Sequence, residues 1–197
     1  MNLTTAPTTA GPISPETGSG SASGSHAGAA VYSSPVGNGS AKSYSANTWA
    51  VNDYWQFQVS ATGYQGIMLS YDQNGSGTGP GTFQLEYSTD GTDFTAFGSA
   101  YTLTSGVTWA TGTPNQATHE SFDLSAITAL NNASVVDFRL IDTSTVSVAG
   151  GTVGSGGTDR VDNVDITATL VPEPSSLAVV GLGGAVASFF AFRRRKV

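Results

Sequence analysis

The densest group of charged side chains outside the C-terminal region is Asp159, Arg160, Asp162 and Asp165. On an extended strand Asp162 shares a face with the apolar residues that follow it, so it points towards the core near the start of the strand. A carboxylate there needs a partner, which Arg160 or a turn amide could supply. Alternatively, Asp159, Asp162 and backbone carbonyls of residues 150–157 could provide the hard oxygen ligands of a structural calcium ion, the one cofactor that the sequence suggests.

Aromatic side chains are the next candidates for a binding site. A flat Trp or Tyr ring beside amide and carboxylate groups can stack on a pyranose face. Trp49, Trp109, Tyr54 and Tyr64 lie at strand ends or off the inferred core face, whereas Trp55 belongs to the core set. We therefore place any glycan stacking at Trp49 and Trp109. The simpler alternative is that these rings are partly buried at an edge of the fold.

Catalytic groups are not evident in the sequence. Glycosidases need two facing carboxylates about 5 to 10 Å apart, but Asp90 and Asp93 flank a turn, where Asp side chains bond to the backbone. His26 and His119 have no metal-ligand partner at a useful spacing, and we expect both to be solvated. The chain has no Gly-x-Ser-x-Gly elbow and no phosphate-binding glycine loop. We expect a protein without catalytic activity, with a secreted hydrolase as an alternative.

Alternating apolar and polar residues predict the elements that position these groups. Such segments are half-buried strands, and Gly-, Asn- and Asp-rich turns separate them. Only residues 124–131 have a helical pattern, with Ser125 as the expected N-cap. About seven to nine short strands with frequent turns predict an all-β, antiparallel, jelly-roll-like β-sandwich. The alternating segments are residues 55–59, 67–71, 83–87, 94–97, 100–103, 121–124, 136–140 and 164–166.

The sequence divides into three parts. Residues 1–40 are rich in Thr, Pro, Gly and Ser and lack apolar periodicity, so we expect mostly loop there, with Val31-Tyr32 as a short edge strand. Residues 41–170 hold the predicted sandwich and are numerous enough for one domain with a core. Residues 171–197 differ from both in composition and form a separate tail.

Charge and cysteine content exclude two classes of function. Of the 14 acidic residues only Glu173 lies in the tail, and of the seven Lys and Arg residues four do. The chain before Pro172 therefore has 13 acids, three bases and a net charge of −10, which excludes nucleic acid as a partner. The absence of cysteine excludes disulfides and thiol chemistry.

The tail has three chemically distinct parts: two prolines flanking a glutamate, a run of 18 uncharged residues, and four cations. A helix of 18 residues is about 27 Å long, close to the hydrocarbon thickness of a bilayer. Because four cations are costly to translocate, they stay in the cytoplasm and leave the preceding domain outside. We predict a transmembrane helix at residues 175–192. The flanking parts are Pro172-Glu173-Pro174 and Arg193, Arg194, Arg195 and Lys196.

This arrangement resembles the PEP-CTERM sorting signal, which many exported proteins of Gram-negative bacteria that make exopolysaccharide carry. In that family a membrane-embedded exosortase is thought to recognise and process the signal. The resemblance implies an exosortase and the inner membrane as partners, with Pro172-Glu173-Pro174 marking the processing region. Residues 37–40, 52–57, 76–80, 87–91 and 157–164 also resemble a sandwich domain recurrent in PEP-CTERM proteins, which implies a non-enzymatic extracellular β domain.

The first residues do not fit export. The sequence after Met1 has neither the basic n-region nor the apolar stretch of a signal peptide, so we interpret Met1 as an internal methionine and the signal peptide as missing. We expect a protein held in the inner membrane with its domain outside the cytoplasm, then delivered to the cell surface or the exopolysaccharide matrix as a structural component. The alternatives are a permanent, unprocessed anchor and a carbohydrate-binding module for an extracellular polysaccharide.

Overall fold

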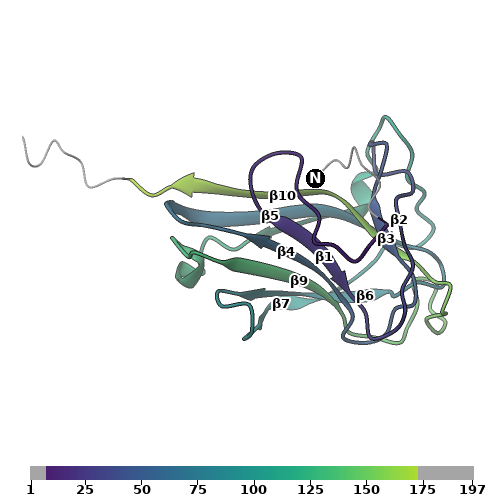
Figure 1. Cartoon of the computed structure of the whole chain (residues 1–197). Helices are drawn as coiled ribbons and strands as arrows, with labels where there is room; N and C mark the ends of the chain where they lie inside the picture. The colour runs from purple at the N-terminus through teal and green to yellow at the C-terminus, as the bar shows by residue number, and fades with distance from the viewer. Residues whose placement is uncertain (1–7, 173–197) are drawn as a thin grey trace, which may run out of the picture.

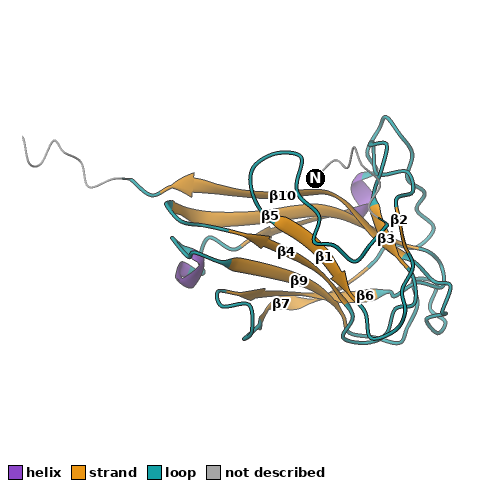
Figure 2. Cartoon of the chain, viewed as in Figure 1, coloured by secondary structure: helices purple, strands orange, loops and turns teal. Residues whose placement is uncertain are grey.

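The computed structural model describes residues 8–172, which form ten strands and two short 3-10 helices and contain no α-helix (Figure 2). The elements are β1 (Ser21–Ser25), β2 (Tyr32–Ser33), β3 (Tyr44–Ala46), β4 (Tyr54–Val59), β5 (Tyr64–Gly75), β6 (Thr82–Ser88), β7 (Thr95–Thr102), η1 (Gln116–Thr118), β8 (His119–Asp123), η2 (Thr128–Leu130), β9 (Val136–Asp142) and β10 (Asp159–Leu170).

The strands form two five-stranded sheets that pack face to face (Figure 1). One sheet has the order β1-β4-β9-β6-β7, the other β2-β3-β10-β5-β8. All strand pairs in the described residues are antiparallel. The predicted all-β antiparallel sandwich is therefore confirmed. Within residues 8–172, only β2–β3 and β6–β7 are consecutive strands of the same sheet, so most connections cross between the sheets.

The period-2 pattern explains which side chains fill the space between the sheets. Trp55, Leu69, Phe83 and Phe138 are fully buried, each on a strand whose alternate residues face outwards. Burial of apolar surface at about 25 cal/mol per Å² is the main stabilising contribution to such a core. The two predicted segments at 94–97 and 100–103 correspond to a single strand, β7.

The N-terminal segment contributes more to the sandwich than its composition predicts. Residues Ser21–Ser25 form β1, which pairs along β4 at the edge of one sheet. Gly24 permits this pairing, because a Cβ atom there would lie 2.7 Å from Tyr32 Cε1 and 2.9 Å from Trp55 Cζ3. The short strand expected at Val31-Tyr32 is observed one residue later, as β2.

The helix predicted at residues 124–131 is wrong. The segment contains only the three-residue 3-10 helix η2, whose N-cap position is Ile127 and not Ser125. The backbone N–H of Ser125 instead donates to Asp123 Oδ1 at 2.9 Å. Local turn bonding of this kind competes with continuous helix formation.

A bulge in β10 changes which residues face the core. Asp162 pairs with Asp72, but the next pair is Asp165 with Ser70, so β10 holds one extra residue there. Asn163, at this position, adopts a φ of 49°, a left-handed conformation that Asn tolerates better than most residues. Residues on the two sides of the bulge therefore change faces, and Asp162 lies on the outer face of its sheet. The prediction that Asp162 points towards the core is wrong.

Candidate functional site

Trp49 is buried in the core, with 6% of its surface exposed. Its ring packs edge-on against Trp55 and Phe83, with centroid distances of 5.3 and 5.6 Å. Its Nε1 donates to the carbonyl of Ala46 at 2.9 Å. The ring therefore has no open face for a sugar, and its burial is more complete than the alternative of partial burial at an edge predicts.

Trp109 is buried as well, with 2% of its surface exposed. The guanidinium carbon of Arg160 lies 4.7 Å from its ring centroid, and its Nε1 donates to Thr118 Oγ1 at 2.9 Å. Trp109 therefore helps to close the outer face of a sheet. Of the other aromatic candidates, Tyr54 is half-buried beneath the guanidinium of Arg139, whereas Tyr64 is 42% exposed.

Asp159 is a buried carboxylate at the start of β10. Its Oδ1 accepts hydrogen bonds from Trp55 Nε1 at 2.6 Å and Gln73 Nε2 at 3.0 Å, while its Oδ2 has no partner. Burial raises the pKa of this carboxyl group to about 8, partly opposed by the two hydrogen bonds and reinforced by the nearby charge of Asp142. Such a shift marks a carboxyl group whose charged form is poorly solvated.

Two further acids lie near Asp159, at the end of the sandwich where β4 begins and β9 ends. Burial raises the pKa of Asp142 to about 6, and its Oδ2 also lacks a partner. Asp53 is better satisfied, because its two oxygens accept from the backbone N–H groups of Ala27 and Ala50, each at 2.7 Å. These acids tie loops to the ends of strands.

Asp162 lies beneath the loop that precedes β3. Its Oδ2 accepts from the backbone N–H of Asn38 at 2.7 Å and from Ser40 Oγ at 2.6 Å. A turn amide thus binds one oxygen of this carboxylate, as one of the two structural alternatives predicts, while Oδ1 is buried without a partner. Arg160 does not, because its guanidinium donates to the carbonyl of Val36.

Asp159 and Asp162 do not come together as the calcium pair that the sequence suggests. They are three residues apart in the regular part of β10, so their side chains lie on opposite faces of the sheet. Within residues 8–172, no group of three or more His, Asp or Glu side chains is arranged to hold a metal ion.

Asn38 organises a buried polar network around Asp162. Its Nδ2 donates to Asp72 Oδ2 at 2.9 Å, its Oδ1 accepts from the backbone N–H of Asn115 at 2.6 Å, and its carbonyl accepts from Asn163 Nδ2 at 2.8 Å. The second oxygen of Asp72 lies 2.9 Å from His119 Nδ1. The network joins two loops to β5, β8 and β10, and sequence reasoning missed it because its members are far apart in the chain.

The other histidine is also engaged. His26 Nδ1 lies 2.8 Å from the hydroxyl of Tyr32, and the ring packs edge-on against Trp49 with a centroid distance of 4.4 Å. Burial lowers its pKa. The expectation of a solvated side chain is therefore wrong for His26.

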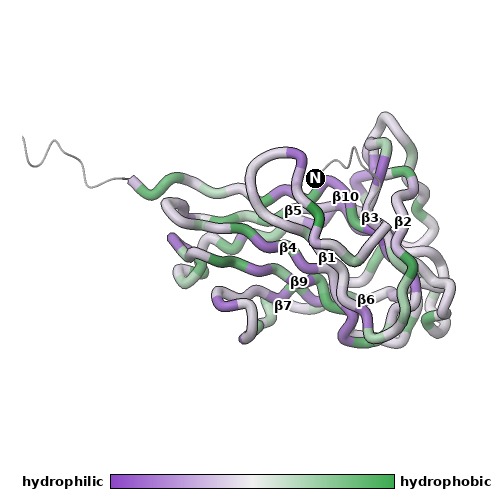
Figure 3. Tube along the Cα trace, viewed as in Figure 1, coloured by the Kyte–Doolittle hydropathy of each residue, from purple (hydrophilic) through white to green (hydrophobic). Residues whose placement is uncertain are grey.

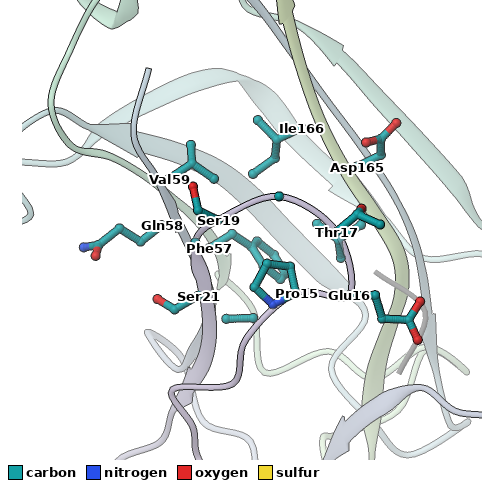
Figure 4. Close-up of a pocket in the computed structure, with 14 residues that line it drawn as sticks. Pro15, Glu16, Thr17, Ser19, Ser21, Phe57, Gln58, Val59, Asp165 and Ile166 are labelled. Carbon is teal, nitrogen blue, oxygen red and sulfur yellow. The ribbon is translucent and has the colours of Figure 1, made fainter. Parts of the chain in front are cut away.

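One cavity of about 260 Å³ lies between the N-terminal loop and the strands β4 and β10. Figure 4 shows Phe57, Val59 and Ile166 on the strand side of this cavity and Thr17 and Ser19 on the loop side. Two carboxylates, an amide and a further hydroxyl complete the polar part of its lining; they belong to Glu16, Asp165, Gln58 and Ser21.

The tail leaves the sandwich directly from β10. Leu170 is the last paired residue, opposite Tyr64, and the backbone N–H of Val171 donates to the carbonyl of Gly63 at 2.9 Å. Pro172 follows at once and is exposed. No helix in the described part of the chain is long and apolar enough to cross a bilayer. The predicted span at 175–192, Glu173, Pro174 and the cations Arg193, Arg194, Arg195 and Lys196 lie outside the described residues.

Comparison with solved structures finds remote likenesses, including three proteins of different kinds. The enzymatically active domain of tailspike protein 4 from bacteriophage CBA120 has 9% identity and a TM-score of 0.39, over 76% of this chain and 19% of that one. TmCBM61 in complex with β-1,4-galactotriose has 8% identity and a TM-score of 0.41, over 76% and 88%. The K2 cleaved adhesin domain of Lys-gingipain has 18% identity and a TM-score of 0.40, over 72% and 83%. At these TM-scores the likenesses carry no information about a ligand of this chain.

Comparison with protein families gives a specific result for the tail. No curated protein matches the chain. Residues 170–196, however, match the PEP-CTERM protein-sorting motif. The match begins at the last residue of β10, so the motif follows the folded domain without an intervening linker. The chain thus carries a PEP-CTERM protein-sorting motif directly behind an antiparallel β-sandwich.

Proposed function

We propose that this protein is exported, held in the inner membrane by residues 175–192, processed by an exosortase near Pro172, and delivered to the cell surface or exopolysaccharide matrix as a non-enzymatic component. The match of residues 170–196 to the sorting motif carries this proposal. The exposed position of Pro172, one residue beyond the last backbone hydrogen bond of the sandwich, supports access for a processing enzyme.

Processing can be tested in a bacterium that has an exosortase. The full chain, with an epitope tag before the sandwich and a signal peptide supplied upstream, is expressed in this host and in its exosortase deletion strain. We expect a shortened form only where the exosortase is present. Replacement of Pro172, Glu173 and Pro174 by alanine should abolish it. A chain of the same length in both strains would contradict the proposal.

The environments of the buried acids support a role without catalysis. Asp53 and Asp162 accept hydrogen bonds from backbone amides, and Asp159 from buried side chains. A glycosidase needs two carboxylates that face each other across a substrate. Incubation of the purified chain with polysaccharides of the producing strain should release no reducing ends, and release would contradict this part of the proposal.

A second candidate function is carbohydrate binding in the cavity beneath the N-terminal loop. The apolar floor at Phe57, Val59 and Ile166 and the polar rim at Glu16 and Asp165 combine the two kinds of surface that a sugar ring requires. This cavity replaces Trp49 and Trp109 as the candidate sugar-binding site, because the rings of both residues are buried.

A glycan array tests the second candidate. Binding should fall when Glu16 and Asp165 are both replaced by alanine. The matched control is Asp93→Ala, which removes an exposed acid from the β6–β7 turn, away from the cavity. No glycan retained above background, or equal retention by all variants, would contradict carbohydrate binding at this site.

A further inference from the structure

The short connection between the sandwich and the tail limits how far the domain can lie from a bilayer. The last backbone hydrogen bond of the fold is made by Val171, and the uncharged run begins at Ser175. Four residue steps span at most about 14 Å. Since each headgroup layer is about 5 to 8 Å thick, an inserted tail leaves the end of the sandwich less than about 10 Å from the headgroups.

The position at which β10 leads into the tail also determines which end of the domain faces the lipid. Figure 1 shows β10 ending at the same end of the sandwich as the β4–β5 turn and η2. The carbonyl of Gly63 binds the N–H of Val171, and the carbonyl of Tyr64 accepts from the N–H of Asn132, so the turn, the exit and the segment after η2 are joined.

This end exposes large apolar side chains at the base of the tail. Leu170 is 69% exposed, Tyr64 42%, Met68 43% and Val171 39%. Tyr64 and Met68 belong to β5, Leu170 ends β10 and Val171 follows it, and Figure 3 shows the apolar character of the chain at the end of β10. Scattered exposed apolar residues are ordinary, but Tyr64 lies directly opposite Leu170 and Val171 follows it, while Met68 lies further along β5, opposite Thr167. Tyr is, in addition, a residue favoured at bilayer interfaces.

The two loops at this end carry no charged side chain, although Asp123, opposite Met68 at the end of β8, is exposed beside one of them. Residues 60–63 and 124–135 include no Asp, Glu, Lys or Arg. The β6–β7 turn, which carries Asp90 and Asp93, belongs to the other sheet. Because the tail leaves from β10, the sheet that contains β10 lies nearer to the bilayer than the β6–β7 turn.

We infer that the end of the sandwich formed by residues 60–64, 124–135 and 168–171 is a membrane-contacting face, which lies against the lipid headgroups while the tail is inserted. The inference rests on the anchored state in the proposed function, and it adds the orientation of the domain on the bilayer. The domain therefore presents its opposite end, with the loops before β4 and after β9, to the exterior.

The absence of cysteine from the chain allows a direct test. Single cysteines are introduced at Thr62 and Ala129, both exposed at the membrane-contacting face, and at Ser105, exposed in the loop after β7 at the opposite end. Each full-length variant is labelled with a fluorophore and reconstituted into phosphatidylethanolamine–phosphatidylglycerol vesicles containing lipids spin-labelled at the headgroup. Circular dichroism before reconstitution checks that each variant is folded.

We expect quenching at positions 62 and 129 to be several-fold stronger than at position 105. Equal quenching at the three positions would overturn the inference, as would a chain that does not float with the vesicles. A further variant with Tyr64→Glu and Leu170→Glu should weaken quenching at position 129 without releasing the chain. Because the vesicles contain no exosortase, failure of processing in cells and failure of membrane contact are separate results.

Discussion

The two ends of the sandwich differ in the side chains that they bury. At the end away from the tail, Asp53, Asp142 and Asp159 are enclosed, two of them with an oxygen that lacks a partner. At the tail end, apolar residues such as Leu124 and Leu130 are buried together with Asp137, whose Oδ1 accepts from Gln56 and Gln58 and whose Oδ2 has no partner. Long loops cover the first end, while short turns and η2 close the second (Figure 1).

This difference indicates that order at the two ends has different physical origins. Loops at the far end depend on buried polar contacts, which are strong only when every group is paired. The tail end depends on apolar packing and leaves its remaining apolar surface at the point where the tail departs. Substitutions at the far end should therefore change stability and its pH dependence, and substitutions of the exposed apolar residues at the tail end should not.

Asn38→Ala should have the largest effect on the free energy of unfolding, a loss of about 3 kcal/mol, because it leaves buried groups of Asn115 and Asp72 with fewer partners. Urea denaturation measures it. Asn132→Ala, at the tail end, is the matched control: its Oδ1 accepts one exposed hydrogen bond from Gly63, and we expect a loss of about 1 kcal/mol. Equal losses would contradict the contrast between the ends.

Asp159→Asn should remove a pH dependence of stability. The pKa of Asp159 is raised to about 8 in the folded state by burial, so deprotonation is easier in the unfolded chain, and stability falls as pH rises from about 4 to 8. Between pH 5 and pH 7 this group alone lowers the free energy of unfolding by roughly 2 to 3 kcal/mol.

The measurement is denaturation of both proteins at pH 5 and pH 7. The free energy of unfolding of Asp159→Asn should lack the decrease between pH 5 and pH 7, and this variant should be more stable than the unmodified protein at pH 7. Asp142→Asn serves as a control that should affect stability over a lower pH range, because the pKa of Asp142 is raised only to about 6. If the free energy of unfolding of Asp159→Asn decreased with pH as steeply as that of the unmodified protein, this carboxylate would not be the titrating group.

The strands could be predicted from the sequence, but the environments of the candidate site residues could not. Trp55, Phe83 and Phe138 alternate with polar residues, which is sufficient to place them in the core. The burial of Trp109 depends on Arg160, which is 51 positions away. The face of Asp162 depends on the bulge at Asn163, for which Asn is only a weak signal.

The N-terminal strand β1 also could not be predicted from its own residues. β1 consists of Ser, Ala and Gly, residues without strand propensity, and it forms because β4 offers it a partner. The tail is the contrasting case. Its signal is contiguous, so the sequence alone was sufficient to recognise the motif at residues 170–196.

Asp90→Ala should have a smaller effect with the opposite pH dependence. Hydrogen bonds from the backbone N–H groups of Asp93 and Thr92, and from Ser88, hold the pKa of Asp90 below its usual value. The stability from this group is present above about pH 4 and is lost as pH falls. We expect a melting temperature a few degrees lower at pH 7, with a difference that narrows at pH 3.

Calorimetry at the two pH values checks this prediction. Asp93→Ala is the control, because it leaves the carboxylate that accepts the turn hydrogen bonds in place. A temperature difference for Asp90→Ala that is the same at pH 3 and pH 7 would contradict it.

The smallest effects should come from the exposed apolar residues at the base of the tail. Met68→Ser and Leu170→Ser should each change the free energy of unfolding by less than about 0.5 kcal/mol, because 43% of Met68 and 69% of Leu170 are already exposed to solvent. Leu69→Ala, one position from Met68 but fully buried, should cost about 2 to 5 kcal/mol. If urea denaturation gave Met68→Ser a cost comparable to Leu69→Ala, these residues would be part of the fold. A negligible cost together with weaker contact with vesicles would assign their apolar character to the bilayer.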